Sequence, residues 1–402
     1  MKLKKLLRKN QSKIVLLVLD GLGGLPDPDT RLTELETART PQLDALATES
    51  ICGLHLPISS GITPGSGPAH MALFGVDPVE HHVGRGALSA MGIDFDLEPT
   101  DVAARGNFCT LDSEGVITDR RAGRITTEKN RELVERLQKE VSLSQVEFFV
   151  KTIKEHRMLL VLRGEGLSDA IGDTDPNQPG EKPLEPRATE GGDGPAEKTR
   201  RAVEEFLTQA RKVLSSEEQA NMVLLRGFAK HPDLPTMESA YGLRSAVLAS
   251  YPLYRGLARL LGMEAIDTGA SLTDKAAAVA KRRDDYDFFF IHIKPTDSSG
   301  EDGDFARRVA LLEEIDGTIP ELRRAEPDVL IVTGDHSTPA RLKSHSWHPV
   351  PIFIHSRYCR PDGVAAFGER DCLSGGLGPR LPATEIMPLA LANALRLDKF
   401  GA

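Results

Sequence analysis

The sequence is poor in cysteine. Its 402 residues include four cysteines, Cys52, Cys109, Cys359 and Cys372, which lie far apart and form no CxxC pair. Cysteines so distributed are typical of reduced thiols in a cytosolic protein rather than of a disulfide framework. We therefore expect a cytoplasmic protein.

Excess positive charge is also absent. The formal net charge of -9 argues against a general nucleic-acid binder, because the phosphate backbone demands a basic surface. It still allows a local basic pocket for a small anion. No GxxxxGK[ST] loop is present, so a nucleotide-dependent transferase of the kinase type is set aside.

Long apolar runs are missing as well. The first 13 residues, MKLKKLLRKNQSK, are basic, and the apolar run that follows them ends at Asp20. This run is too short to span a membrane, and it has no signal-peptide cleavage site. We expect a short solvated arm before the first strand and no membrane partner.

Short apolar runs that alternate with helical segments are the dominant pattern. The runs at Lys13–Leu19, Phe288–Ile293 and Val329–Val332 are typical of strands buried on both faces. Such alternation predicts an α/β fold with a doubly wound, mostly parallel sheet. This alternation of strands and helices is interrupted in the middle of the chain. We therefore predict a catalytic domain of residues 1–93 and 236–402, interrupted by a smaller α/β insert of residues 94–235.

Reactive side chains follow four of the predicted strands. Asp20, Ser66, Asp297 and the pair Asp335-His336 each lie just beyond a strand, and His345 follows shortly after. The carboxyl ends of parallel strands meet at one edge of a sheet. One such aspartate could be a simple turn cap, but convergence of this kind predicts a metal site built from carboxylate and imidazole ligands.

Ser66 fits a nucleophile at this edge. It lies in Gly65-Ser66-Gly67-Pro68 at the start of a predicted helix, where backbone N–H groups suit a phosphate. Taken alone, this tetrapeptide is better read as a capped turn. A hydroxyl needs a base or a metal for activation. Two ions could serve here, with ligands taken from Asp20, Asp335 and His336 for one, and from Asp297, His345 and Glu301 for the other.

The insert supplies six arginines at or near the ends of predicted strands, and an asparagine two residues after the first of them. These residues are Arg105, Asn107, Arg120, Arg121, Arg124, Arg163 and Arg226. Guanidinium groups bind phosphate and carboxylate bidentately. Any single one is more simply a solvated surface residue, but as a set they predict a lid that binds a small anionic substrate.

The motifs in their order resemble the alkaline phosphatase superfamily. They are the Asp in VLDGLGG, the Ser in GSGPAH, the Asp in KPTDSSGEDGDF, the Asp-His in TGDHSTP and the His in SHSWHPVP. The chain more closely resembles the cofactor-independent (2,3-bisphosphoglycerate-independent) phosphoglycerate mutases of the archaeal type, also through ARGNF, DRRAGR, DTDP and the terminal KFGA. The resemblance runs nearly end to end and includes the insert.

This resemblance implies interconversion of 3-phosphoglycerate and 2-phosphoglycerate, in glycolysis and gluconeogenesis, through a phosphoserine at Ser66. It implies two divalent ions, with Mn²⁺ expected first and Mg²⁺, Co²⁺ or Zn²⁺ as alternatives. One ion would be bound by Asp20, Ser66, Asp335 and His336, and the other by Asp297, the residue at 301 and His345. Related sequences usually carry His at the position of Glu301. Glutamate also binds hard divalent ions, and Asp302 could compete for the role.

The sequence is also compatible with functions other than that of a mutase. A metal-dependent phosphatase or phosphonate-processing hydrolase would use the same serine and metals but let water attack the phosphoserine. A catalytically silent metal- or ligand-binding protein is a further alternative. The arginine-bearing insert favours the mutase, because a phosphatase need not retain its alcohol product. We expect a monomer or small homo-oligomer.

Overall fold

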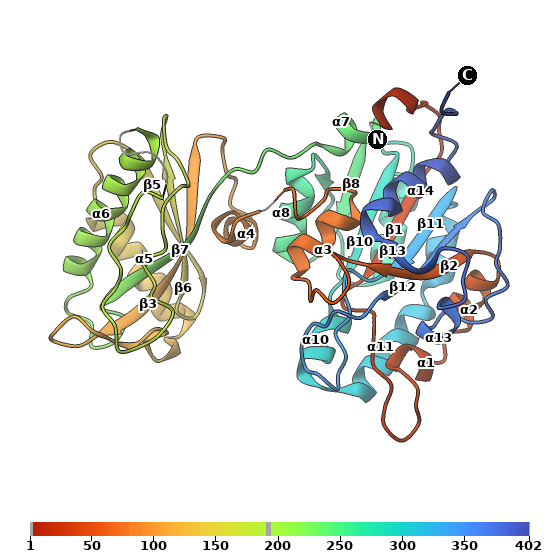
Figure 1. Ribbon diagram of the computed structural model, residues 1–402, viewed down its shortest axis with the longest axis horizontal. Coiled ribbons are helices and arrows are strands. Elements are labelled where there is room, and N and C mark those ends of the chain that lie inside the picture. The colour runs from red at the N-terminus through yellow and green to blue at the C-terminus, as the bar shows by residue number, and fades with distance from the viewer. Residues whose placement is uncertain (1–2, 82, 190–193, 402) are drawn as a thin grey trace. The chain divides into compact units, whose positions relative to one another are not determined.

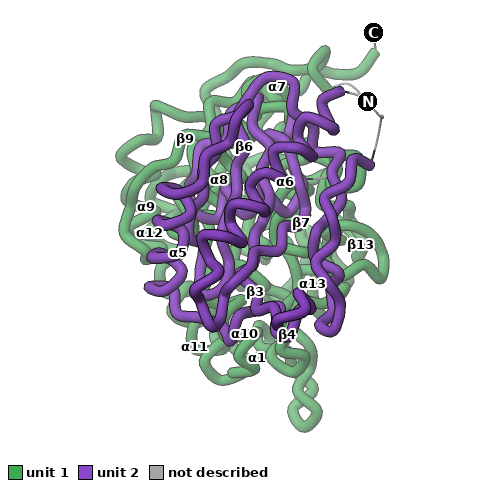
Figure 2. Tube along the Cα trace, turned by 90° about the vertical axis from the view of Figure 1, so that its left-hand side faces the viewer, with its two compact units in different colours: residues 1–82, 234–402 green, residues 83–233 purple. Residues whose placement is uncertain are grey.

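The chain forms two compact units in a computed structural model that describes residues 3–81, 83–189 and 194–401. Unit 1 comprises Met1–His82 and Leu234–Ala402, and unit 2 comprises Val83–Asp233; Figure 2 colours them separately. The insert therefore begins about ten residues earlier than the predicted boundary at 94. The reason is helix α4 (Arg85–Met91), which contacts strands β3 (Asp101–Leu111) and β7 (Met222–Lys230) of unit 2.

Unit 1 is built on an eight-stranded sheet of order β13-β2-β12-β11-β1-β10-β8-β9. The strands are β1 (Ile14–Leu19), β2 (Ile51–Leu56), β8 (Ser245–Leu248), β9 (Glu264–Ala265), β10 (Phe288–Ile293), β11 (Val329–Thr333), β12 (Val350–Ser356) and β13 (Gly378–Pro382). All neighbours pair in parallel except β12, which is antiparallel to β11 and β2. The predicted mostly parallel α/β sheet is confirmed.

Strand β12 reverses direction because its connection to β11 carries no helix. Residues 334–349, all described, contain turns and bridges only. A parallel pair would need a crossover, usually helical, on a face of the sheet. The reversal makes β12 begin at the edge where the parallel strands end. It therefore brings the preceding residue His345 to that edge.

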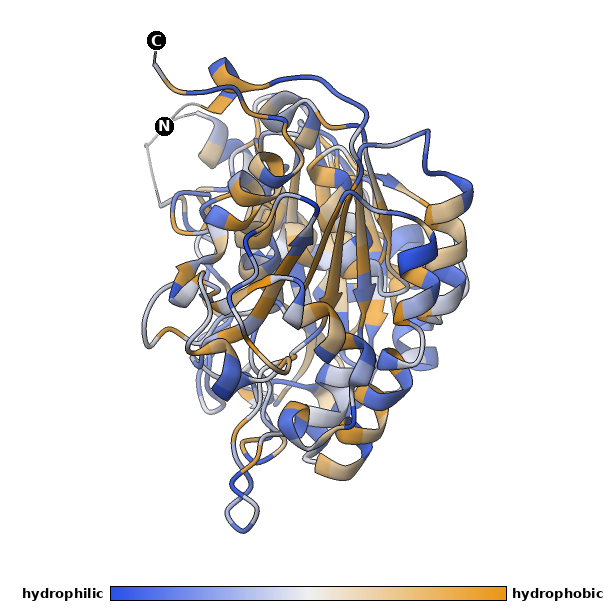
Figure 3. Ribbon diagram, turned by 90° about the vertical axis from the view of Figure 1, so that its right-hand side faces the viewer, coloured by the Kyte–Doolittle hydropathy of each residue, from blue (hydrophilic) through white to orange (hydrophobic). Residues whose placement is uncertain are grey.

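Helices cover both faces of this sheet, as Figure 1 shows. All six residues of β1 are buried, and Val15, Leu17 and Leu19 join one core cluster. That cluster is completed by helices α1 (Glu34–Thr37), α2 (Pro41–Thr48), α9 (Leu272–Lys281), α11 (Phe305–Asp316), α12 (Ile319–Arg324) and α13 (Glu369–Cys372). A second set of helices contacts the sheet or one another, namely α3 (Ser66–Leu73), α7 (Met237–Tyr241), α8 (Pro252–Leu260) and α14 (Ile386–Asn393). The strands are correspondingly hydrophobic in Figure 3.

Helix α10 (Pro295–Asp302) occupies a segment for which the sequence predicts no helix. Proline at its first position presets the backbone angle. Gly303 ends it with φ of 77°, the left-handed conformation that glycine adopts without steric cost. Asp297 and Glu301, four residues apart, consequently lie on one face of a helix.

Unit 2 holds an antiparallel sheet with its own core. Its strands are β3, β4 (Ile117–Asp119), β5 (Glu147–Lys154), β6 (Arg157–Arg163) and β7, in the order β4-β3-β6-β5 with β7 also paired to β3. Helices α5 (Thr127–Glu140) and α6 (Pro195–Val213) supply Leu133, Leu137, Val203 and Phe206 to this core. Unit 2 thus buries its apolar side chains independently.

The described part of the predicted N-terminal arm is not free. Residues Leu3–Leu6 form a 3₁₀ turn, Leu7 forms a bridge with Leu397, and the Arg8 N–H donates to the Arg396 carbonyl at 2.9 Å. Residues 1 and 2 of the arm lie outside the described residues. Among the described helices, none is both long and apolar enough to cross a bilayer.

Candidate metal centre and anion-binding face

The sheet of unit 1 brings the predicted ligands together at one edge. Strand β1 lies between β10 and β11 in parallel register, with Leu19 opposite Ile293 and Val18 opposite Thr333. Two groups of donor atoms converge there, each within 4.8 Å. The first is Asp20, Asp335 and His336, and the second is Asp297, His336 and His345.

The imidazole of His336 lies at the centre of the first group. Its Nε2 atom is 3.2 Å from Ser66 Oγ, 3.1 Å from Asp335 Oδ2 and 3.6 Å from Asp20 Oδ1. Its Nδ1 atom is 2.9 Å from Thr338 Oγ1, whose hydroxyl donates to Asp297 Oδ1 at 2.7 Å. This network assigns the proton to Nδ1, which leaves the Nε2 lone pair for a metal.

Two buried carboxylate oxygens of this group accept no well-formed hydrogen bond, Asp20 Oδ1 and Asp335 Oδ2, although His70 Nδ1 lies 3.2 Å from the latter. The other oxygen of each residue is satisfied. Asp20 Oδ2 accepts from Tyr254 Oη at 2.6 Å and from His292 Nε2 at 3.0 Å, and Asp335 Oδ1 accepts from the Gly21 N–H at 3.0 Å. An unpartnered buried carboxylate oxygen is costly without a cation. The donor set therefore fits a divalent ion, which takes hard oxygens and imidazole nitrogen.

The protonation states suit a metal as well. Burial and the neighbouring Asp335 raise the pKa of Asp20, but His292 and Lys294 outweigh them, so this pKa lies below its usual value. Burial likewise raises the pKa of Asp335, yet His336 and His70 bring it well below the usual value. Burial lowers the pKa of His336. At neutral pH the carboxylates are ionised and this imidazole is neutral, the forms that bind metals.

The second group is more open. His345 Nδ1 donates to the Pro64 carbonyl at 3.0 Å, so its Nε2 is free to face Asp297 Oδ1 at 3.6 Å. Glu301 approaches with Oε1 at 3.9 Å from the same Nε2, and its side chain is 55% exposed. The rings of His345 and His336 stack at 3.6 Å between centroids, so the two groups are adjacent.

The loop after β1 is fixed from beneath by a fully buried arginine, Arg308. Its guanidinium donates to the carbonyl oxygens of Gly21, Leu22, Gly23 and Thr338 and pairs with Glu34 at 2.9 Å. Gly21 has φ of 69°, and a Cβ atom there would lie 2.6 Å from Thr338 Oγ1. Glycine is therefore required for the close approach of this loop to Thr338.

Several residues around the ligands were not predicted from the sequence: His70, Tyr254, His292, Lys294 and Thr338. His292 carried a usable signal, because it is a polar residue inside the otherwise apolar strand FFFIHI. Lys294 carried the same signal as the ligands, because it directly follows strand β10. Tyr254 carried none, since its segment reads simply as a helix.

On unit 2, the strand register places two predicted arginines face to face. Arg105 of β3 lies directly opposite Arg226 of β7, and Asn107 lies opposite Arg157 of β6. Like charges directly opposite are destabilising. No described carboxylate lies within ion-pair distance of Arg105, whereas Arg226 pairs with Asp175 at 3.4 Å. Arg105 Nε, Asn107 Oδ1 and Arg226 Nε are buried without hydrogen-bond partners. Burial, followed by the charges of Arg85 and Arg157, lowers the pKa of Arg105 to about 10.

We call Arg85, Arg105, Asn107, Arg157 and Arg226 the arginine face. The sequence did not point to Arg85 or Arg157. Helix α4 approaches β7 at Gly227, where φ is 60° and a Cβ atom would lie 2.5 Å from Arg85 Cβ. An accumulation of cations with unpartnered donors can bind an anion with phosphate or carboxylate groups.

The remaining predicted arginines do not join this face in the same way. Arg163 forms a bidentate pair with the buried carboxylate of Asp101, with both N–O distances 2.7 Å. Arg120 pairs similarly with Asp175, at 2.9 and 2.7 Å. Arg121 and Arg124 are exposed beside the short 3₁₀ turn Ala122–Arg124.

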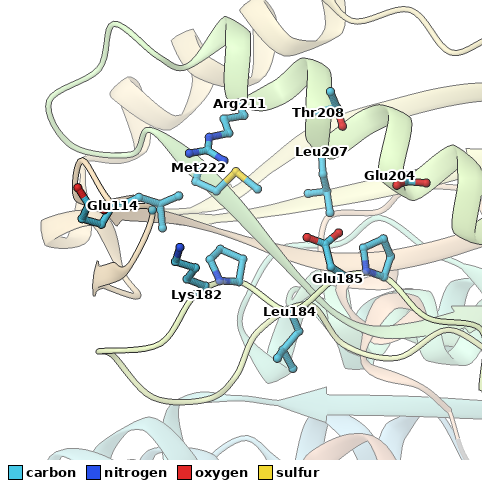
Figure 4. A pocket seen from close by; sticks show the side chains of 13 residues that line it. Glu114, Lys182, Leu184, Glu185, Glu204, Leu207, Thr208, Arg211 and Met222 are labelled. Atoms are coloured by element: carbon cyan, nitrogen blue, oxygen red, sulfur yellow. The ribbon is translucent and has the colours of Figure 1, made fainter.

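Unit 2 also contains a pocket of about 400 Å³ between α6 and the 182–186 segment, shown in Figure 4. Its walls include Glu114, Lys182, Glu185 and Arg211 around an apolar part at Leu207. None of the predicted substrate-binding residues lines it.

These features define an α/β protein with two adjacent groups of residues that could hold metal ions and a serine hydroxyl at the start of a helix. The sequence profile of the 2,3-bisphosphoglycerate-independent phosphoglycerate mutases matches residues 47–220. A probable phosphoglycerate mutase of this kind from Aquifex aeolicus is 48% identical, covering 99% of both chains. One from Thermus thermophilus is 49% identical, covering 100% of this chain and 98% of the relative.

A solved structure agrees. The cofactor-independent phosphoglycerate mutase from Thermoplasma acidophilum is 32% identical and superposes with a TM-score of 0.77, covering 95% of this chain and 100% of that one. The chain belongs to the 2,3-bisphosphoglycerate-independent phosphoglycerate mutase family.

Proposed function

We propose that this chain is an isomerase that interconverts 3-phosphoglycerate and 2-phosphoglycerate without 2,3-bisphosphoglycerate, in glycolysis and gluconeogenesis. The observation that carries the proposal is the position of Ser66. Its hydroxyl lies 3.2 Å from His336 Nε2, at the start of α3 and beside the two unpartnered oxygens of Asp20 and Asp335. A nucleophile, a helix N-terminus and a cation site thus adjoin one another.

Two divalent ions, Mn²⁺ by preference, would complete the site. Asp20, Ser66, Asp335 and His336 would hold one, and Asp297, Glu301 and His345 the other. Bound there, such ions would lower the pKa of the serine hydroxyl and neutralise charge on the phosphoryl oxygens. We retain Glu301 rather than Asp302 as a ligand because Glu301 is the one that approaches His345.

Ser66 would carry the phosphoryl group between the two positions of the substrate. Its Oγ attacks phosphorus, the bond from phosphorus to the substrate 3-oxygen breaks, and the proton lost by Ser66 ends on that oxygen. The bound glycerate then reorients. Its 2-hydroxyl attacks the phosphoserine, and a proton returns to Ser66 Oγ. The N–H groups at the start of α3 would bind the phosphoryl oxygens throughout.

The arginine face of unit 2 would retain the glycerate while the phosphoserine exists. Arg105 and Asn107 are its strongest candidates, because each has a buried polar atom without a partner. We rank Arg120, Arg163 and Arg226 lower, since internal carboxylates already bind them. Retention of the alcohol and exclusion of water separate a mutase from a phosphatase. We therefore assign unit 2 the role of substrate-binding lid.

The test is an assay of the purified chain, stripped with a chelator and reloaded with Mn²⁺. It is given 3-phosphoglycerate without bisphosphoglycerate, and both 2-phosphoglycerate and inorganic phosphate are followed. We expect 2-phosphoglycerate, lost again on chelation. Inorganic phosphate as the sole product would identify a phosphatase instead. Formation of neither product would refute the assigned substrate.

We further infer a cytoplasmic location, because all four cysteines are free and three of them are buried. We infer a monomer or small homo-oligomer in solution. Sedimentation of the purified chain tests the latter, and a large assembly would contradict it.

A further inference from the structure

Lys294 contacts one carboxylate from each metal-ligand group. It directly precedes α10, at the end of β10. Its ammonium lies 2.5 Å from Asp297 Oδ2 and 3.2 Å from Asp20 Oδ2. Asp20 belongs to the first group and Asp297 to the second. One side chain therefore spans both groups.

The contacts are made on the sides of the carboxylates that face away from the donor clusters. Asp20 Oδ2 also accepts from Tyr254 and His292, whereas Asp20 Oδ1 has no partner. Asp297 likewise turns Oδ2 to Lys294 and Oδ1 toward His345 Nε2. Each carboxylate thus has one oxygen occupied by Lys294 and the other directed at a donor group.

The charges explain why such a contact is needed. Asp20, Asp297 and Asp335 are each 0% exposed, and carboxylates packed together repel one another in a low-dielectric interior. Lys294 lies between two of the three. Its ammonium also lies 5.7 Å from the ring centroids of Tyr251 and Tyr254, two neighbouring rings that attract a cation.

We propose that Lys294 is a positioning residue that holds Asp20 and Asp297 at the same time, and so preorganises both metal sites. The inference rests on the proposed function only in that divalent ions bind these two groups. Residues beyond the ligands commonly orient them, and their loss typically weakens metal affinity by about 10–100-fold. Because Lys294 spans both groups, its loss weakens both binding events.

His292 provides the single-site comparison. Its Nε2 donates to Asp20 Oδ2 at 3.0 Å and not to Asp297, so His292→Phe weakens only one binding event. Lys275 provides the control for a buried lysine. Its ammonium binds the carbonyl oxygens of Gly269 and Ala270 at 3.0 and 2.7 Å, so Lys275→Met perturbs the fold and leaves metal affinity unchanged.

The experiment is titration of the chelator-stripped full chain with Co²⁺, followed by calorimetry and by the visible absorption of the bound ion. We expect two binding events in the wild-type chain, both weakened about tenfold or more by Lys294→Met. The absorption of both bound ions should also change, which a purely structural role would not produce. Lys294→Gln, which loses the charge but keeps a hydrogen-bond donor, covers the case in which Lys294→Met does not fold, and it should weaken both events as well.

Several results would overturn the proposal. Wild-type affinity or tighter binding in both lysine variants would show that Lys294 does not position ligands, and loss of only one event would show that it does not span the sites. Failure of the wild-type chain to bind Co²⁺ would also refute the proposal. A wild-type chain that binds two ions but forms no 2-phosphoglycerate would remove the proposed reaction and leave the role of Lys294 standing.

Discussion

At the scale of single residues, the centre depends on which atom of each ligand is already occupied. Thr338 Oγ1 accepts a hydrogen bond from Nδ1–H of His336, and the Pro64 carbonyl accepts one from Nδ1–H of His345. In both cases the same ring nitrogen, Nε2, is left for coordination. Partners of this kind fix the tautomer and ring orientation of metal-binding histidines.

The first prediction at this scale concerns the nucleophile. Ser66→Ala should lower mutase turnover to background, a loss on the order of 10⁵-fold, because no other hydroxyl is proposed to receive the phosphoryl group. Melting temperature and Mn²⁺ content should change little. Ser60→Ala, at an exposed position of the same loop, is the matched control and should keep full activity. Residual turnover above about one percent in Ser66→Ala would exclude the phosphoserine route.

A second prediction concerns pH and His55, which donates from Nε2 to the Gly334 carbonyl at 3.0 Å. Burial lowers the pKa of His55 to about 4, whereas its value in the unfolded chain is about 6.5. Because the folded pKa is depressed, the neutral ring stabilises the fold fully above pH 6.5, and this contribution is lost as the pH falls toward 4. Between those values the free energy of unfolding should fall by about 3 kcal/mol more in wild type than in His55→Gln.

Urea unfolding in the presence of a chelator, repeated across this pH range, measures that difference. The chelator removes metal binding as a second source of pH dependence. Parallel pH profiles for wild type and His55→Gln would contradict the prediction.

Residue types at strand ends were enough to predict which carboxylates and imidazoles lie close together, since the edge of a parallel sheet collects them whatever their separation in sequence. The residues that orient those ligands were not predictable in this way. Tyr254 reaches Asp20 from a helix 234 positions away, and nothing in its local pattern distinguishes it from a core tyrosine. Arg308 reads as an ordinary charged position of an amphipathic helix, yet it is fully buried.

At the scale of elements, Arg308 joins helix α11 to the loops that follow β1 and β11. Arg308→Met should lower the free energy of unfolding by about 3–5 kcal/mol, because it leaves Glu34 buried without its partner. Arg307→Met is the matched control. The Arg307 side chain is 52% exposed, and the ion pair that it forms is with the exposed side chain of Glu314. It should change stability by less than about 0.5 kcal/mol. Equal effects of the two substitutions in urea unfolding would refute the role given to Arg308.

The sheet of unit 2 carries arginines for which we propose different roles, substrate binding for Arg105 and a structural ion pair for Arg163. Arg105→Met should raise the KM for 3-phosphoglycerate about tenfold or more, while stability stays constant or rises by up to about 1 kcal/mol, because a repulsive cross-strand pair is removed. Arg163→Met should do the reverse. The substitution leaves the buried Asp101 carboxylate without its ion-pair partner. It should lower the free energy of unfolding by about 3 kcal/mol and leave the KM little changed.

Steady-state kinetics and thermal melts of both variants give the comparison. A large stability loss in Arg105→Met with an unchanged KM would show that Arg105 is structural.

Elements with strong periodicity were predictable almost to the residue. Helix α5, Thr127–Glu140, is one of these, because its apolar residues Leu133, Val134 and Leu137 recur at helical spacing and are buried. Helix α10 was missed because PTDSSGED has low helix propensity. The residues at its two ends, Pro295 and Gly303, are the signals for this helix, and its interior provides none. Strand β13 was missed because GPRLP is a half-exposed edge strand with two prolines, a composition that argues against a strand.

At the scale of the whole molecule, the two units hold separate cores, and all proposed metal ligands belong to unit 1. Chelation should therefore destabilise unit 1 and leave unit 2 unchanged. At a metal concentration of 100 times Kd, the stabilisation removed is about 2.7 kcal/mol. Trp347, the one tryptophan of the chain, lies in unit 1, so its fluorescence reports unfolding of that unit alone. Far-ultraviolet circular dichroism reports both units.

A chelator that shifts the tryptophan transition and only one phase of the dichroism signal would fit two independent cores. A shift of the whole dichroism curve would contradict their independence.

An insert between two halves of a parallel-sheet unit was predictable, because the alternation of strands and helices is interrupted in the middle of the chain. Its first boundary was not, because helix α4 carries a Gly-Ala-rich sequence without a clear periodicity. What assigns α4 to unit 2 is its packing on the nearby strand β3 and on β7, which lies more than a hundred residues further on and meets α4 at Gly227.

The opposed arginines of unit 2 have a practical consequence for handling the protein. Two cations held face to face by strand register will take up whichever small oxyanion is most abundant in the medium. Sulfate and inorganic phosphate are therefore competitors rather than inert buffer components. Kinetic work on this chain belongs in zwitterionic buffers with chloride salts, and crystals grown from ammonium sulfate will carry an anion between Arg105 and Arg226.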